Sequence, residues 1–187
     1  MMKIRHYALA TVLLAGGIGM GTATTMRFAH GQPAGARSEA DEGKELFKRA
    51  NCMGCHKWHG GGGGGYGGDA LSLRKTELDR DQIIETISCG RPGTGMPHFT
   101  RDAYDSGDKC FGLTKKDLGD KVPPEPQTFL RPNEIAAVTD YVLAHVKGQG
   151  EPTFAQCQDF FGQGSRVCNT YKGKGEEGTG APAKQGG

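Results

Sequence analysis

Five consecutive residues, Cys52-Met53-Gly54-Cys55-His56, constrain this chain more than any other part of its sequence. Two thiols three positions apart are followed at once by an imidazole, so three strong ligand side chains lie close together in sequence. Six glycines follow at 60–65, and they allow backbone to pass close to a bound group because glycine has no Cβ. A run this long also fits a flexible surface loop.

Three kinds of site use closely spaced cysteines. A zinc site needs four ligands, commonly from a second C-x-x-C or an H-x₃₋₅-H pair, and the sequence has no such second pair. A thioredoxin-like pair lies between a strand and a helix, and no β-branched run precedes Cys52. C-x-x-C-H is the pattern of covalent haem attachment, in which both thiols bond to the haem and the histidine binds iron. The motif therefore predicts one covalent haem c.

The N-terminus has the pattern of an export signal. Basic residues at positions 3, 5 and 6 precede an uncharged stretch at 8–26, and Ala34-Gly35-Ala36 offers a small-residue cleavage site. We expect a signal peptide over 1–36. The alternative is an uncleaved membrane anchor, since the uncharged stretch is just long enough to span a bilayer. Both interpretations place the body of the protein outside the cytoplasm, in the periplasm.

Removal of 1–36 leaves 20 basic and 21 acidic residues, from totals of 23 and 21, because Lys3, Arg5 and Arg27 are lost. A nearly neutral chain without a basic stripe argues against a nucleic-acid-binding protein. The other four cysteines would pair in an oxidising compartment. Their spacing leads us to predict the disulfides Cys89–Cys110 and Cys157–Cys168.

Three main helices are expected. The first covers 40–50, where Gly43 indicates close approach of another element. The second covers 80–88, with Asp79 as N-cap and Gln82 completing a capping pair. The third begins at Pro132, carries an apolar stripe and stops at Gly148. Between the last two, glycine and proline at 90–99 place Met96 on an extended loop.

Over 38–148 these features resemble a class I c-type cytochrome with one haem. The resemblance rests on the G-x-x-x-F helix, the C-x-x-C-H motif, the glycine-rich loop, Gly95-Met96-Pro97 and the C-terminal helix with Tyr141. It implies an all-α fold packed around the haem. It also implies thioether links from Cys52 and Cys55, with His56 and Met96 as the two iron ligands. A backbone carbonyl within 67–71 is expected to accept the second ring N–H of His56.

Two other histidines are rivals for iron. His98 would give a bis-histidine haem of lower potential, whereas His59 lies too near His56 in sequence to reach the opposite haem face. In such cytochromes partners dock at an exposed haem edge, and that rim would be drawn here from Met53, Lys57, Arg91, His98 and Arg101.

Two segments exceed the minimal cytochrome fold. We call 100–130 the insertion and 149–171 the extension, and we expect 172–187 to be a disordered tail. Similar extensions occur in cytochromes that serve periplasmic quinoprotein alcohol dehydrogenases.

The predicted function is single-electron transfer between a dehydrogenase and a terminal acceptor, with redox proteins as partners and no catalysis of bond chemistry. The alternatives are a haem subunit of a membrane-anchored complex and, as a third candidate, a haem enzyme or ligand sensor with an open iron site.

Overall fold

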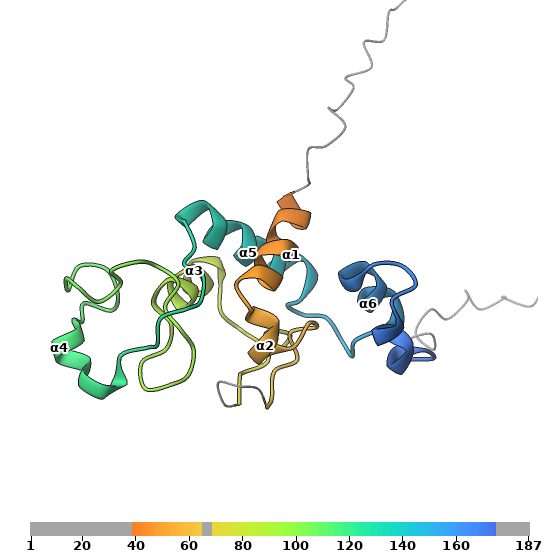
Figure 1. The fold of residues 1–187 in the computed structure, drawn as a ribbon, viewed down its shortest axis with the longest axis horizontal. Helices are drawn as coiled ribbons and strands as arrows, with labels where there is room; N and C mark the ends of the chain where they lie inside the picture. Colours follow the sequence, from red (N-terminus) through yellow and green to blue (C-terminus); the bar gives the residue numbers. More distant parts are fainter. Residues whose placement is uncertain (1–38, 65–68, 175–187) are drawn as a thin grey trace, which may run out of the picture. The chain divides into compact units, whose positions relative to one another are not determined.

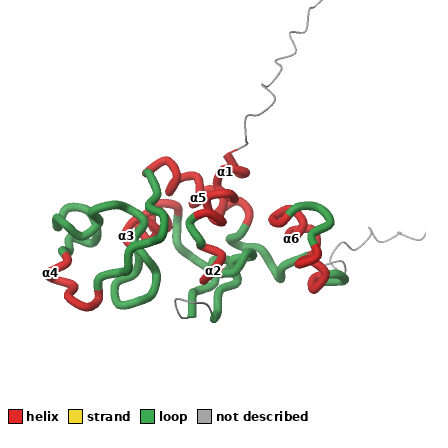
Figure 2. The backbone as a smooth tube through the Cα atoms, in the orientation of Figure 1, coloured by secondary structure: helices red, strands yellow, loops and turns green. Residues whose placement is uncertain are grey.

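Helices joined by long loops make up the fold of the computed structural model, which describes residues 39–64 and 69–174 (Figures 1 and 2). These residues contain no strand. The α-helices are α1 (Glu39–Arg49), α2 (Cys52–His56), α3 (Arg80–Cys89), α4 (Lys115–Leu118), α5 (Pro132–His145) and α6 (Phe154–Phe161), with short 3₁₀ helices η1 (Gly119–Lys121) and η2 (Arg166–Tyr171). The expected all-α fold is confirmed. The expected signal peptide and most of the expected tail lie outside the described residues.

The pair α1 and α5 forms the centre of the fold and shares the most extensive contact between two helices. Gly43 makes this approach possible, because a Cβ there would overlap the Ala137 carbonyl oxygen and lie 2.6 Å from the Tyr141 Cβ. One turn further along α1, the Phe47 ring packs on Tyr141 with centroids 5.8 Å apart. The close approach expected at Gly43 is therefore confirmed.

The ends of α3 and α5 follow their sequence signals closely. Asp79 accepts from the Gln82 backbone N–H, while the Gln82 side chain accepts from the Asp79 N–H, which completes the predicted capping box. Pro132 occupies the first turn of α5. That helix ends at His145, before the predicted stop at Gly148, since the Lys147 N–H turns back to the Val142 carbonyl.

One main hydrophobic core lies between α1, α3 and α5, and a smaller one lies between the end of α3 and the insertion. The main core contains Leu46, Phe47, Ala50, Ile83, Ile87, Phe99, Leu130, Ile135, Val138, Tyr141, Val142, Val146 and Phe160. The smaller core contains Cys89, Ala103, Tyr104 and Cys110. Phe160 belongs to α6, so the extension contributes to the main core.

Both predicted disulfides are present in the structure. The Sγ atoms are 2.02 Å apart in Cys89–Cys110 and 2.05 Å apart in Cys157–Cys168. The first joins the end of α3 to the insertion, and the second joins α6 to η2. The first disulfide therefore anchors the insertion to α3, whereas the second closes the extension on itself.

The extension packs against the loop that follows α2. The Trp58 Nε1–H donates to the Tyr171 hydroxyl at 3.1 Å, and the Trp58 ring packs on Phe160.

Within the described ranges, no helix is long and apolar enough to cross a membrane.

Candidate haem site

The short helix α2 brings the three motif side chains to one side of the chain. Cys52, Cys55 and His56 stand at positions i, i+3 and i+4, which share a helix face. Asn51 precedes them in the left-handed region, with φ of 58°, and redirects the chain between α1 and α2. A Cβ at Gly54 would lie 2.6 Å from the Asn51 side chain, so the small residue inside the motif lets this turn close.

Two thiols remain unpaired while the other four cysteines form disulfides. Cys52 and Cys55 are both half-buried. Burial raises the pKa of the Cys52 thiol to about 12, and the nearby Cys55 adds to the effect. At neutral pH this side chain is therefore protonated, and a protonated thiol exchanges slowly with disulfides.

The imidazole of His56 is held through one ring nitrogen. Its Nδ1 lies 3.0 Å from the Leu71 carbonyl oxygen, and we assign the proton to Nδ1 so that it donates this bond. The other ring nitrogen, Nε2, then carries a lone pair. Burial lowers the pKa of His56, and the positive charge of Arg91 lowers it further against the effect of the Leu71 carbonyl. A neutral imidazole is the form that binds a metal.

The carbonyl expected within 67–71 is thus that of Leu71. The chain reaches it after the glycine-rich loop, where the Gly63 N–H donates to the Ala70 carbonyl at 2.8 Å. A Cβ at Gly62 would overlap this same carbonyl oxygen. At this position, therefore, a glycine is required for the return of the chain toward His56.

Met96 lies on the loop after α3, half-buried and outside any helix. Its side chain packs against the main core, as do those of Cys52 and Met53. Its N–H donates to the Thr94 hydroxyl at 3.2 Å, and its carbonyl accepts from the Arg91 N–H at 3.3 Å. Gly90, with φ of 66°, lets the loop fold back, because a Cβ there would lie 2.6 Å from the Met96 carbonyl oxygen.

The two rival histidines are engaged elsewhere. His98 is only 4% exposed, its Nδ1 lies 2.9 Å from the Thr100 carbonyl, and its ring packs between Tyr104 and Phe129. The expectation that His98 lines an exposed docking rim is therefore wrong, because aromatic residues of the insertion cover it. His59 accepts a hydrogen bond at Nδ1 from the Gly61 N–H.

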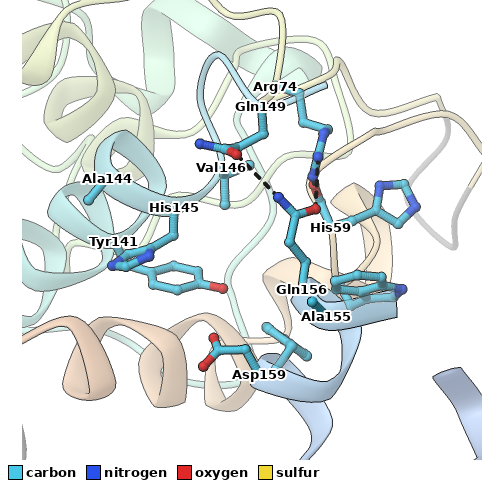
Figure 3. Close-up of a pocket in the computed structure, with 12 residues that line it drawn as sticks. His59, Arg74, Tyr141, Ala144, His145, Val146, Gln149, Ala155, Gln156 and Asp159 are labelled. Atoms are coloured by element: carbon cyan, nitrogen blue, oxygen red, sulfur yellow. Dashed lines mark hydrogen bonds between the residues drawn. The ribbon is translucent and has the colours of Figure 1, made fainter. Parts of the chain in front are cut away.

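A cavity of about 340 Å³ lies where α5 faces α6, and His59 is among the residues that line it (Figure 3). Tyr141, His145, Gln156 and Asp159 are among its lining residues, and none of the four predicted haem residues is. Arg74 also lines it. This side chain is buried and donates to the carbonyls of Gly150 and His59 and to the Gln156 side chain.

Arg74 and Leu71 are the residues of this region that the sequence does not single out. Arg74 joins the loop after α2 to the extension, but no motif marks a lone arginine as buried. Leu71 acts through its backbone carbonyl, which every residue has. The spacing from the haem motif indicates only that the accepting carbonyl lies within 67–71.

The donor set fits a covalent haem. Two free thiols and an imidazole with one available nitrogen lie on α2. The half-buried thioether of Met96 packs against the main core, as does Cys52. Thiols are the groups that bond to haem c, and histidine with methionine is a common ligand pair for its iron.

Residues 38–110 match the family model described as cytochrome c oxidase, cbb3-type, subunit III. No curated protein and no solved structure matches the chain. The matched segment includes the haem motif, the Met96 loop and the first disulfide. With the helical fold around them, these residues lie in a class I c-type cytochrome domain, a module that carries covalently bound haem c and transfers electrons.

Proposed function

We propose that this protein is an exported, periplasmic electron carrier with one haem, bonded to Cys52 and Cys55 and ligated by His56 and Met96. The observation that carries this proposal is the hydrogen bond from His56 to the Leu71 carbonyl. It fixes the ring and leaves Nε2, on the face of α2 that also bears both thiols, as the free nitrogen. A histidine that binds metal commonly donates its other ring N–H in this way.

The bound haem supplies a one-electron couple between Fe(III) and Fe(II). The chain would contribute orientation of His56 through the Leu71 carbonyl, exclusion of water through the main core, and the Met96 thioether as a ligand. Methionine with histidine raises the reduction potential relative to two histidines. With Met96 as the second protein ligand of the iron, no position on the haem would be left open for a substrate. We therefore expect a carrier and not an enzyme.

The partners we propose are a periplasmic dehydrogenase as donor and a cytochrome or oxidase as acceptor. The domain organisation we propose is a cytochrome domain at 38–148 with the insertion at 100–130, then the disulfide-linked extension at 149–171 and a tail at 172–187.

The ligand set is tested by the absorption spectrum of the oxidised protein. We expect the sulfur-to-iron charge-transfer band that methionine ligation produces, together with reversible oxidation and reduction. Met96→Ala should abolish the band. Met53→Leu is the matched control, because Met53 also packs against the core but lies inside the motif. A wild-type protein without the band, or a Met53→Leu variant that loses it, would refute Met96 as ligand.

A second candidate is a haem subunit held in a membrane complex. The description of the matching family, an oxidase subunit, favours it. The two candidates differ in the fate of the N-terminus. A measured mass that matches a chain beginning after Ala36, together with recovery of the protein in the soluble periplasmic fraction, supports the carrier. A retained N-terminus in the membrane fraction supports the subunit.

A further inference from the structure

The insertion contacts the Met96 loop on both sides of the methionine. Near its end the insertion runs back past the loop, and two hydrogen bonds join them. The Gly93 N–H donates to the Lys121 carbonyl at 2.8 Å, and the His98 N–H donates to the Pro124 carbonyl at 3.2 Å. One donor lies three residues before Met96 and the other two residues after it. Residues far from Met96 in sequence therefore restrain the loop that carries it.

The insertion is itself anchored to the end of α3, directly before that loop. The Cys89–Cys110 disulfide is fully buried, with both residues at most 2% exposed. Beside it, the Tyr104 hydroxyl donates to the Cys89 carbonyl at 2.7 Å. The backbone N–H of Thr100 donates to the Ser88 carbonyl at 3.0 Å. These contacts fix the start of the insertion against the helix from which the loop departs.

His98 links the two regions. Its ring lies against Tyr104, near the start of the insertion, and against Phe129, near its end. Both ring centroids are 5.9 Å from that of His98. The two ends of the insertion thus hold His98, which lies two positions after Met96, between them.

The Met96 loop needs such restraint. Its residues 90–99 include three glycines and two prolines, and none of them is helical. Glycine has the largest backbone freedom, so the three glycines of this loop would gain much entropy when Met96 leaves the haem iron. Contacts that remove this freedom in advance favour the ligated state.

We propose that the insertion, closed by Cys89–Cys110, is a buttress that positions Met96 as the axial ligand. Tyr104 and His98 are its positioning residues, and the inference rests on the proposed ligation by Met96. The insertion thus sets how readily the thioether is displaced from the haem iron.

Competition with added imidazole measures this directly in the complete oxidised holoprotein. Imidazole replaces the thioether, and loss of the charge-transfer band gives its apparent affinity. Tyr104→Phe removes one hydrogen bond from the buttress. We expect the imidazole concentration for half-replacement to fall about fivefold, which corresponds to about 1 kcal/mol for one hydrogen bond. A Cys89→Ala/Cys110→Ala double variant should show a larger fall.

Two matched controls separate positioning from general stability. Tyr171→Phe removes one phenol oxygen from the extension, and Cys157→Ala/Cys168→Ala removes its disulfide. Both should keep the wild-type imidazole affinity even where far-ultraviolet circular dichroism shows a loss of global stability. Tyr104→Phe decides the question if the cysteine variant of the insertion does not fold.

The outcomes distinguish the two proposals. A wild-type band with equal imidazole affinity in wild type and Tyr104→Phe overturns the buttress and leaves Met96 as ligand. Equal falls in the insertion and extension variants also overturn it, because the effect would then be general. A wild-type protein with no band overturns the ligand assignment, and the buttress with it.

Discussion

At the scale of single residues, Gly43 is the position where one added methyl group has the clearest consequence. The Ala137 carbonyl oxygen and the Tyr141 Cβ fill the space that a side chain would need. Neither atom can rotate away, because one belongs to the backbone of α5 and the other is bonded directly to it. Gly43→Ala must therefore move α1 and α5 apart. We expect a loss of about 1–3 kcal/mol in the free energy of unfolding, as for other overpacked sites.

Chemical denaturation measures this loss, and Gly150→Ala is its control. Nothing lies within 4 Å of a Cβ at Gly150, so that variant should change stability by less than about 0.5 kcal/mol. Equal stability of the two variants would show that α1 and α5 separate without cost.

Residues differ in how far the sequence predicts them. The carbonyl that holds His56 lies at Leu71, inside the short stretch that motif spacing indicates. The resemblance to class I cytochromes places His98 at the exposed haem edge, because it stands beside Met96. It is buried because Tyr104 and Phe129 pack on it, and no local pattern indicates which residues of the insertion reach back to it. Tertiary contacts decide its exposure.

At the scale of helices, the start of α5 depends on one buried carboxylate. Glu134 accepts from the Arg131 backbone N–H at 2.8 Å and from the Arg49 guanidinium of α1 at 2.6 Å. The Arg131 side chain and backbone, with a smaller contribution from Arg49, lower the pKa of Glu134 from its ordinary 4.5 to about 2. The charged carboxylate therefore joins α1 to α5.

This shift predicts a pH dependence of stability. Because the pKa of Glu134 is lower in the folded state, its contribution is complete above pH 4.5 and disappears as pH falls toward about 2. We expect the melting temperature of the wild type to fall more steeply across this window than that of Glu134→Gln. Glu85→Gln, at an exposed position of α3, should keep the wild-type slope. Parallel profiles for wild type and Glu134→Gln would contradict the prediction.

Helix boundaries were predictable where the signal is a cap. Asp79 with Gln82 begins α3, Thr114 begins α4 and Thr153 begins α6, each through side-chain bonds to nearby backbone. The helix α2 was not predicted, because five residues are too few for an apolar period to appear. The end of α5 was placed too late, since Gly148 lies past a turn that closes at Lys147.

At the scale of the whole molecule, charge around the predicted haem residues is positive although the chain is nearly neutral. Lys57 is exposed directly after the motif, Arg91 is near enough to lower the pKa of His56, and the Lys121 side chain lies beside Gly93. Opposite charges mainly accelerate association, and salt screens them with a Debye length of about 8 Å at physiological ionic strength.

We therefore expect oxidation of the reduced protein by hexacyanoferrate(III), an anion, to slow as salt is raised. Oxidation by a cationic cobalt complex should accelerate. Stopped-flow absorbance measures both rates. Lys57→Glu should slow the first reaction further at low salt, whereas Lys116→Glu, an equal charge change at an exposed position of α4, should not. A rate independent of salt for both oxidants would exclude electron exchange at this positive face.

Trp58 is the sole tryptophan of the chain, and the extension holds it two residues beyond His56. Its indole is therefore a built-in fluorophore beside the haem motif, subject to quenching through energy transfer to the bound haem. Release of the extension would alter the polarity around the indole and shift its emission maximum. Separation of the indole from the haem would instead increase its emission intensity. Two distinct motions of one molecule thus become separable in a single emission spectrum.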